Sequence, residues 1–258
     1  MTAILKSIIA LQKRIFILAF ILFGFINYSQ AQNTPITDGE IILYKDYNIG
    51  FNLNSLGGGG AYYRHGWHKT GSIKNFVESE LAYVRHPKEI WRYGYQDNPN
   101  TYTYGRLNYV FFWRNSFGQK IELTERSYKN ALGLNFVYNI GITLALLKPA
   151  YIDYFVSNPN GSATLVTERY DPNKHVDEYR IYGNGPILNG FGEISAKAGL
   201  FGRAGLSIDY GQYPDEYKSL EAGVTLDVFN EPLPMVAKAE NKQIFPGFYI
   251  AFNFGWKN

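Results

Sequence analysis

The sequence predicts an all-β protein, an antiparallel up-and-down transmembrane β-barrel of eight strands, with ten strands as the alternative count. Three observations support this fold class. Apolar residues recur at every second position in stretches between residues 44 and 257, the connections alternate between short and long, and the apolar faces end in aromatic residues. A chain of 258 residues that is 46% hydrophobic and 17% aromatic is too rich in large side chains to be disordered.

The alternation is clear in the first predicted strand, where Tyr47, Ile49 and Phe51 lie on one face and Asn48 and Asn52 on the other. Residues 132–146 alternate without a break over a length that exceeds the usual strand of a soluble sheet. If residues 116–119 and 148–150 form turns, the count rises from eight strands to ten. The eight predicted strands cover residues 44–55, 60–69, 75–86, 104–127, 130–157, 192–210, 218–230 and 247–257.

The connections between these strands alternate in length. With the first strand leaving the periplasm, the short connections around 70–74, 128–130 and 211–217 lie on the periplasmic side, and the long connections 87–103, 158–191 and 231–246 lie outside. Short periplasmic turns and long external loops are typical of outer-membrane barrels. The exception is Gly57–Gly60, which predicts a very tight external hairpin because glycine tolerates a positive φ.

A secreted β-sandwich or a lipocalin-like barrel would also alternate, but its apolar face would be the inside. Here the polar face carries Gly, Asn, Ser, Thr and isolated charges, which suit a crowded lumen. The apolar face ends in Tyr47, Trp113, Tyr210 and Trp256, which suit interfacial aromatic girdles. These features favour the membrane barrel over the soluble one.

Residues 1–31 read as a secretory signal peptide that is cleaved near Ala31, so residues 32–258 form one outer-membrane barrel domain. The leader contains Lys6, Lys13 and Arg14 without an acidic residue, followed by the apolar run Ile15–Ile26. Without these three cations, 22 basic residues balance 22 acidic ones, so the charge gives no support for nucleic-acid binding. The absence of cysteine excludes disulfides, Cys-ligated zinc and iron–sulfur clusters.

Isolated charges on the polar face predict a structural charge network inside the barrel, because the lumen of an eight-stranded barrel has room only for side chains. A solute pore is therefore not expected at eight strands, although a narrow solute channel stays open as an alternative function. The residues expected in this network are Glu78, Glu80, Arg106, Arg114, Glu193, Lys197, Arg203, Glu221 and Asp227.

Sequence motifs give no catalytic, cofactor-binding or metal-binding residues. The four histidines, His65, His68, His86 and His175, lie in no hydrolase or zinc motif, so an enzyme is not expected, and a membrane-embedded lipid hydrolase stays as an alternative. His65 and His68 are three residues apart and face opposite sides of a strand, which disfavours a shared metal. Asp171 and Asp177 match no calcium loop, and Gly57–Gly60 is followed by no phosphate-binding motif.

The long 158–191 connection and its flanks carry aromatic and charged residues of the kind found at protein contacts. With no pore or motif, we expect a non-enzymatic structural or accessory subunit of a larger outer-membrane complex, whose partners are membrane lipid and other outer-membrane proteins. The residues expected at this interface are Tyr154, Phe155, Tyr170, Tyr179 and Tyr182.

Five short segments are distinctive as a set, although none describes a known chemistry: Arg64-His65-Gly66-Trp67-His68, Arg85-His86-Pro87-Lys88-Glu89, Tyr104-Gly105-Arg106-Leu107-Asn108, Leu146-Leu147-Lys148-Pro149 and Glu168-Arg169-Tyr170-Asp171-Pro172. These sequence words resemble those of one family of small outer-membrane β-barrel proteins of Bacteroidota. This resemblance extends over nearly all of residues 32–258, and it implies an accessory subunit of the Bam-type barrel-assembly machinery.

Overall fold

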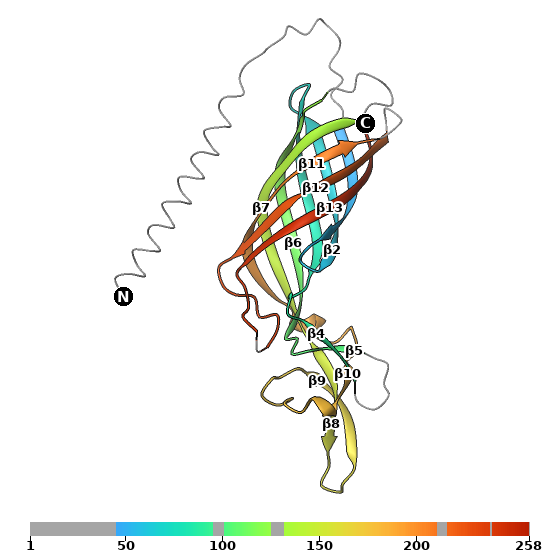
Figure 1. Cartoon of the computed structure of the whole chain (residues 1–258), viewed down its shortest axis with the longest axis vertical. Helices are drawn as coiled ribbons and strands as arrows, with labels where there is room; N and C mark the ends of the chain where they lie inside the picture. Colours follow the sequence, from blue (N-terminus) through green and yellow to red (C-terminus); the bar gives the residue numbers. More distant parts are fainter. Residues whose placement is uncertain (1–44, 95–100, 125–131, 211–215, 238, 258) are drawn as a thin grey trace, which may run out of the picture. The chain divides into compact units, whose positions relative to one another are not determined.

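Eight antiparallel strands close into a barrel in the computed structural model, which describes residues 45–94, 101–124, 132–210, 216–237 and 239–257 (Figure 1). The predicted signal peptide lies outside the described residues. Around the barrel the order is β1-β13-β12-β11-β7-β6-β3-β2, so the first strand pairs with the last. The barrel strands are β1 Lys45–Asn54, β2 Gly58–His68, β3 Ile73–Val84, β6 Asn108–Glu122, β7 Gly133–Pro149, β11 Ser195–Asp209, β12 Glu216–Phe229 and β13 Ile244–Lys257.

The predicted eight-stranded barrel is confirmed, and the alternative count of ten is wrong. Residues 116–119 do not form a turn, because they lie inside β6 and pair with β3 on one side and β7 on the other. Residues 148–150 do not reverse the chain either. Pro149 still pairs with Asn108 of β6, and Ala150 donates its backbone N–H to the carbonyl of Leu107 at 3.0 Å.

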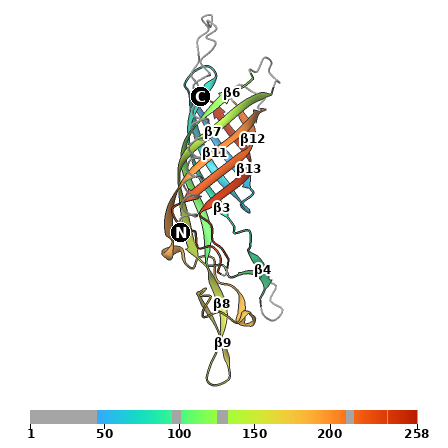
Figure 2. The ribbon, with the colours of Figure 1, turned by 60° about the vertical axis from the view of Figure 1, so that its left-hand side comes forward.

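Two predicted barrel strands were too long. Strand 130–157 divides at Ala150 into β7 and β8 (Tyr151–Ser157), and β8 pairs with β9 (Ala163–Arg169) and β10 (Ile181–Asn184) in a separate three-stranded sheet. Beyond residue 149 the chain has no barrel neighbour, because β6 begins at 108 and β11 at 195. Figures 1 and 2 show β8 and β9 continuing past the rim.

Strand 104–127 corresponds to β6, which begins only at Asn108 and ends at Glu122, while residues 125–127 lie outside the described residues. Tyr104 instead ends β5 (Thr101–Tyr104), which forms a two-stranded sheet with β4 (Ile90–Tyr93). The long connections 87–103 and 158–191 therefore contain short strands of their own. Two 3₁₀ turns, η1 (Glu178–Arg180) and η2 (Phe191–Glu193), complete the described elements.

The connections at the two barrel ends differ in length. The strand ends Lys45 and Lys257 share one end with the connections after β2, β6 and β11. The opposite rim carries the segments between β3 and β6, between β7 and β11 and between β12 and β13. At this rim only residues 55–57 join β1 to β2, with Gly57 at φ 82°, which is the tight hairpin that the glycines predict.

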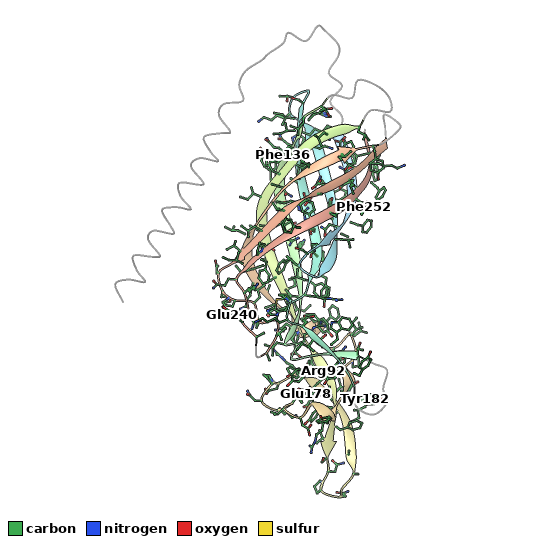
Figure 3. The ribbon with its side chains drawn as sticks, in the orientation of Figure 1. Arg92, Phe136, Glu178, Tyr182, Glu240 and Phe252 are labelled. Atoms are coloured by element: carbon green, nitrogen blue, oxygen red, sulfur yellow. The ribbon has the colours of Figure 1, made fainter. Side chains whose placement is uncertain are left out.

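The barrel wall is apolar outside and polar inside. Phe51 is 56% exposed and Phe248 is 71% exposed on the outer surface, where Figure 3 also shows Phe136 and Phe252. Charged side chains such as Arg114 and Glu221 are almost fully buried inside. A soluble barrel would have the opposite arrangement, so this surface is that of a transmembrane β-barrel. No helix in the described ranges is long and apolar enough to cross a membrane.

We predict that Gly223→Val destabilises the barrel by roughly 1–3 kcal/mol or more. A Cβ at Gly223 would lie 2.2 Å from the Ala204 carbonyl oxygen and 2.5 Å from the Gly205 Cα of the paired strand, which are backbone atoms that cannot move aside. Urea unfolding in lipid vesicles measures the loss. Gly202→Val is the matched control, since a Cβ there meets nothing within 4 Å. Equal stability of the two variants would contradict the prediction.

Candidate functional site

A chain of alternating carboxylates and guanidinium groups crosses the barrel lumen. Arg114 lies at one end of this chain, with Nη1 2.7 Å from Glu80 Oε1 and Nη2 2.8 Å from Asp227 Oδ2. Arg203 continues it by bridging Glu80 and Glu78. All of these side chains are almost fully buried, so the charges neutralise one another in place of water.

Arg64 completes the chain at the other end. Its guanidinium lies 2.6 Å from Glu78 Oε2 and 3.0 Å from Glu221 Oε2. The sequence prediction missed Arg64 as a lumen residue, although its position between Tyr62 and Gly66 on the polar alternation of β2 was a usable signal. We call these seven residues the lumen network: Asp227, Arg114, Glu80, Arg203, Glu78, Arg64 and Glu221.

Polar side chains from the remaining strands attach to the lumen network. Asn52 of β1 donates to Glu80 at 2.8 Å, Asn139 of β7 donates to Glu78 at 3.1 Å, and the Tyr249 hydroxyl of β13 donates to Glu221 at 2.7 Å. Together with the charged residues on β2, β3, β6, β11 and β12, every barrel strand contributes at least one group. The network therefore links the entire circumference of the barrel.

Three residues expected in the lumen lie outside the network. Arg106 precedes β6 and pairs with Glu89 at 2.6 Å above the rim. Glu193 lies in η2, where it is exposed and accepts a hydrogen bond from the Tyr151 hydroxyl. Lys197 does lie on β11, but near its start at the rim, where it pairs with the exposed Glu231 at 2.9 Å. Alternation correctly gives the face of a residue, but it does not give its height along the barrel.

Buried side chains occupy the lumen along the barrel. A second charged group lies nearer the end that holds the strand termini, where Lys120 Nζ is 2.8 Å from Asp209 and 2.9 Å from the Tyr217 hydroxyl. The strands on opposite sides of the barrel bring the members of each group together, and most of these side chains are buried. This arrangement can hold the strands in register, and it does not favour a solute channel.

The five aromatic residues expected at a partner interface have different surroundings. Tyr154 and Tyr170 are only 7% and 6% exposed, because the small sheet needs a core of its own and they pack there on His175. Phe155 and Tyr182 are half-buried against each other, with ring centroids 5.7 Å apart. Tyr179 is 79% exposed. Tyr154 and Tyr170 are thus core residues and cannot contact a partner.

The contacts of His175 are those of a structural residue. His175 is buried, its Nδ1 accepts the Asp171 N–H at 2.9 Å, and its Nε2 lies 2.8 Å from Glu168 Oε1, so both ring nitrogens serve the fold of this segment. His65 and His68 lie on opposite faces of β2, three residues apart. Within the described ranges, no group of three His, Asp or Glu side chains is placed to hold a metal ion.

The carboxylates considered for calcium are used in local turns. Asp171 Oδ1 accepts the Asn173 N–H at 2.8 Å, and Asp177 Oδ1 accepts the Tyr179 N–H at 3.1 Å. Side chains of this type commonly stabilise turns by such bonds to the backbone two residues further on. Both aspartates therefore have a structural explanation.

An exposed apolar surface lies beyond the barrel, and the sequence prediction missed most of it. Ile90, Trp91 and Tyr93 of β4 are all more than half exposed, as is Val176 beside η1. The aromatic and β-branched residues at 90–93, inside a long connection, were the feature of the sequence that could have predicted the β4 part of this surface. We call these four residues and Tyr179 the extramembrane apolar surface.

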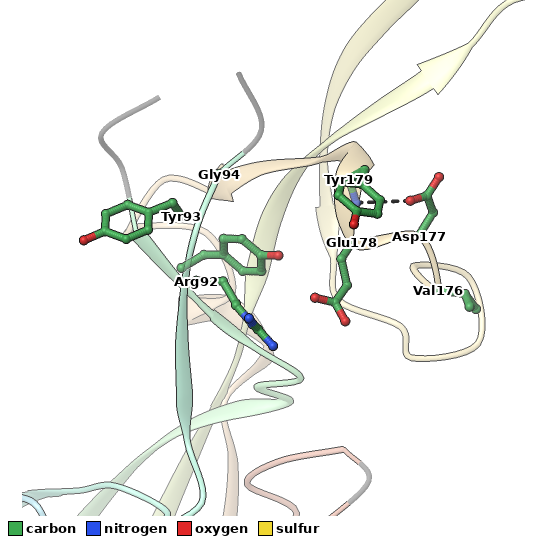
Figure 4. A pocket seen from close by; sticks show the side chains of 8 residues that line it. Arg92, Tyr93, Gly94, Val176, Asp177, Glu178 and Tyr179 are labelled. Atoms are coloured by element: carbon green, nitrogen blue, oxygen red, sulfur yellow. Dashed lines mark hydrogen bonds between the residues drawn. The ribbon is translucent and has the colours of Figure 1, made fainter. Parts of the chain in front are cut away.

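A cavity of about 630 Å³ lies between β4 and the segment around η1, and of this surface Tyr93, Val176 and Tyr179 line it (Figure 4). Arg92 and Glu178 point toward one another across it, and Tyr93 and Tyr179 lie at its edges. Burial, with a contribution from Glu178, raises the pKa of Tyr102 at the cavity wall to about 12. The Tyr102 hydroxyl is therefore neutral at physiological pH and can act as a hydrogen-bond donor.

The fold, the apolar exterior and the filled charged interior define a small transmembrane β-barrel. No family model matches the chain, and no curated protein matches it. Among solved structures, Neisserial surface protein A is 11% identical over 84% of this chain and 96% of its own, with a TM-score of 0.37. Ail of Yersinia pestis, solved with the heparin analogue sucrose octasulfate, is 10% identical over 84% and 99%, with a TM-score of 0.37. Similarity at this level transfers no role to this chain.

We predict that Arg114→Met destabilises the barrel by about 3–5 kcal/mol, because it leaves Asp227 buried without a cation. The double variant Arg114→Met/Asp227→Leu should recover most of this loss, since Glu80 keeps its bond to Arg203. Urea unfolding in lipid vesicles measures both variants. A single variant as stable as the unsubstituted protein would contradict the structural role of the lumen network.

We predict that residues 170–180 loosen in acid. Hydrogen bonds from His175 and then Lys174 lower the pKa of Glu168. A lowered pKa stabilises the folded segment above the ordinary carboxyl pKa of 4.5, and this contribution is lost as the pH falls below it. Amide hydrogen exchange, corrected for the intrinsic pH dependence, should show faster exchange in acid.

Glu168→Gln should show this faster exchange of residues 170–180 already at pH 7, whereas Glu231→Gln, an exposed carboxylate elsewhere, should not. Exchange in the Glu168→Gln variant that follows the same pH profile as the unsubstituted protein would rule out Glu168 as the cause.

Proposed function

We propose that this chain is an integral outer-membrane β-barrel that acts as a non-enzymatic structural or accessory subunit of a larger outer-membrane complex. The observation that carries the proposal is the extramembrane apolar surface. Trp91 is 56% exposed and Tyr93 is 79% exposed, on a sheet that lies outside the barrel wall. Clusters of large apolar residues that face water are characteristic of protein contact sites.

The composition of this surface favours a protein partner. Exposed Trp and Tyr side chains supply most of the binding energy in many interfaces, and charged groups form the surrounding rim. Here Arg92 and Glu178 flank the aromatic residues and can orient a partner by charge (Figure 4). Charged groups that can hydrogen-bond a partner thus lie next to aromatic residues that can make apolar contacts with it.

The small sheet offers a second means of contact. Its order is β10-β8-β9, so β9 is an edge strand, and all of its residues except Glu168 are exposed. Edge strands present unpaired backbone N–H and C=O groups that can pair with a strand of another chain. Within the described residues, β9 pairs with β8 alone.

A role in outer-membrane protein assembly is the more specific form of this proposal, and it is supported by the resemblance of the sequence words to a Bacteroidota barrel family with a Bam-type accessory role. The proposal is also supported by the interior, since a lumen filled by buried ion pairs leaves the surface as the place for function. We infer that the partner is another outer-membrane protein.

The test is extraction of the chromosomally tagged protein in mild detergent, followed by mass spectrometry of the retained proteins. A photo-crosslinking residue at Tyr179 should join the chain to one abundant partner, whereas the same residue at Tyr210, an exposed tyrosine at the other barrel end, should not. The double variant Trp91→Ser/Tyr179→Ser should reduce the recovered partner by about tenfold or more. Tyr210→Ser is the matched control.

Recovery of the chain as a lone monomer, with no crosslinked product from Tyr179, would overturn the proposed function. Recovery of the same partner in undiminished amount from the double variant would show instead that the extramembrane apolar surface is not the interface.

A further inference from the structure

The tight β1–β2 hairpin leaves a notch in the rim of the barrel. Residues 55–57 form its floor, while the end of β3 and the start of β13 rise on its two sides. The Arg85 N–H donates to the Leu56 carbonyl at 2.9 Å, and Ser55 exchanges backbone and side-chain hydrogen bonds with Phe248. The result is a cavity of about 410 Å³ whose walls include Arg85, Trp91, Lys242 and Ile244.

Two cations of this notch have no anionic partner. Within the described residues, no carboxylate lies within 4.0 Å of the Arg85 guanidinium or of Lys242 Nζ. Arg85 Nε is buried and has no hydrogen-bond partner, and its guanidinium is held over the rings of Tyr83 at 5.5 Å and Trp91 at 5.3 Å. The aromatic rings therefore fix a cation that is short of acceptors.

The carboxylate that also lines the notch does not compensate these cations. Glu89 Oε2 lies 2.6 Å from Arg106, and both side chains are nearly buried, so the charge of Glu89 is already neutralised. The remaining charge in the notch is positive, which favours an anion with several acceptor oxygens.

An apolar groove lies directly below the notch on the membrane-facing wall. The outward face of β2 carries only Gly59 and Ala61 there, between the exposed Leu53 of β1 and Leu81 of β3. Lower on the same wall, Ala61 and Leu81 line a hollow of about 350 Å³ together with Ile49 and Trp113. The cationic notch thus stands above a shallow strip of the apolar exterior, where small residues of β2 lie between larger leucines.

We infer that the notch binds the phosphate headgroup of an outer-leaflet lipid, with Arg85 and Lys242 on the phosphate oxygens and an acyl chain in the groove over Gly59 and Ala61. A soluble anion would satisfy the two cations but would leave the apolar groove uncovered. The notch shares Trp91 with the extramembrane apolar surface, but its two cations, Arg85 and Lys242, belong to the notch alone, so substituting them tests the lipid site separately from the proposed accessory role.

The test uses the purified full chain in a lipid-free non-ionic detergent, with native mass spectrometry as the readout. The probes are dioleoyl phosphatidic acid, dioleoylglycerol, which lacks the phosphate, and inorganic phosphate. We expect the chain to retain phosphatidic acid and not dioleoylglycerol. Arg85→Gln/Lys242→Gln should weaken phosphatidic acid binding by about tenfold or more, because two charge-assisted hydrogen bonds are lost.

Arg180→Gln, at an exposed arginine outside the barrel, is the matched control and should bind as the unsubstituted protein does. Lys242→Gln alone changes an exposed residue of the rim, so its barrel should stay closed, which gel mobility checks. This variant should lose less affinity for phosphatidic acid than the double variant does. Unchanged binding by the double variant would overturn the site. Equal retention of dioleoylglycerol, or displacement of phosphatidic acid by an equal concentration of inorganic phosphate, would overturn its assignment to a lipid phosphate.

Discussion

The lumen network is the interaction on which the rest of this structure depends. Three arginines and four carboxylates are buried where water cannot solvate them, and isolating any one of them would be costly. Their mutual geometry exists only when the strands are in one register, because partners such as Arg114 and Asp227 come from β6 and β12, which are not neighbours. The interior charges are therefore neutralised only in the closed barrel.

The eight strands and their faces could be predicted because period-two alternation is a local property. Whether Phe51 faces lipid and Asn52 faces the lumen depends only on their order in the chain. The ends of the strands could not be predicted in this way. The extended chain continues from β7 through Ala150 into β8 without reversing, and only the places where β6 and β11 begin decide where the barrel stops.

The same dependence on strand pairing explains which site residues could be predicted from the sequence. Glu80, Arg114 and Asp227 were predictable lumen charges, since they lie on the polar face of their strands. Lys197 satisfies the same alternation but lies at the rim, and the burial of Tyr154 depends on β9 and β10, which the sequence showed only as one long loop. The positions of Lys197 and Tyr154 depend on which strands pair with one another, and residue spacing within a single strand does not predict that pairing.

The rim is uneven, and its two proposed surfaces share Trp91 but otherwise use different residues. In the order of the barrel, β7 lies opposite β1, so the strand that continues beyond the rim into β8 faces the sector where a three-residue turn ends the wall. The low sector brings cations next to the apolar exterior, where lipid headgroups lie. Beyond the barrel the small sheets expose aromatic residues, which we propose another protein covers. The interior holds the strands together, and both proposed functions use the surface at this end of the barrel.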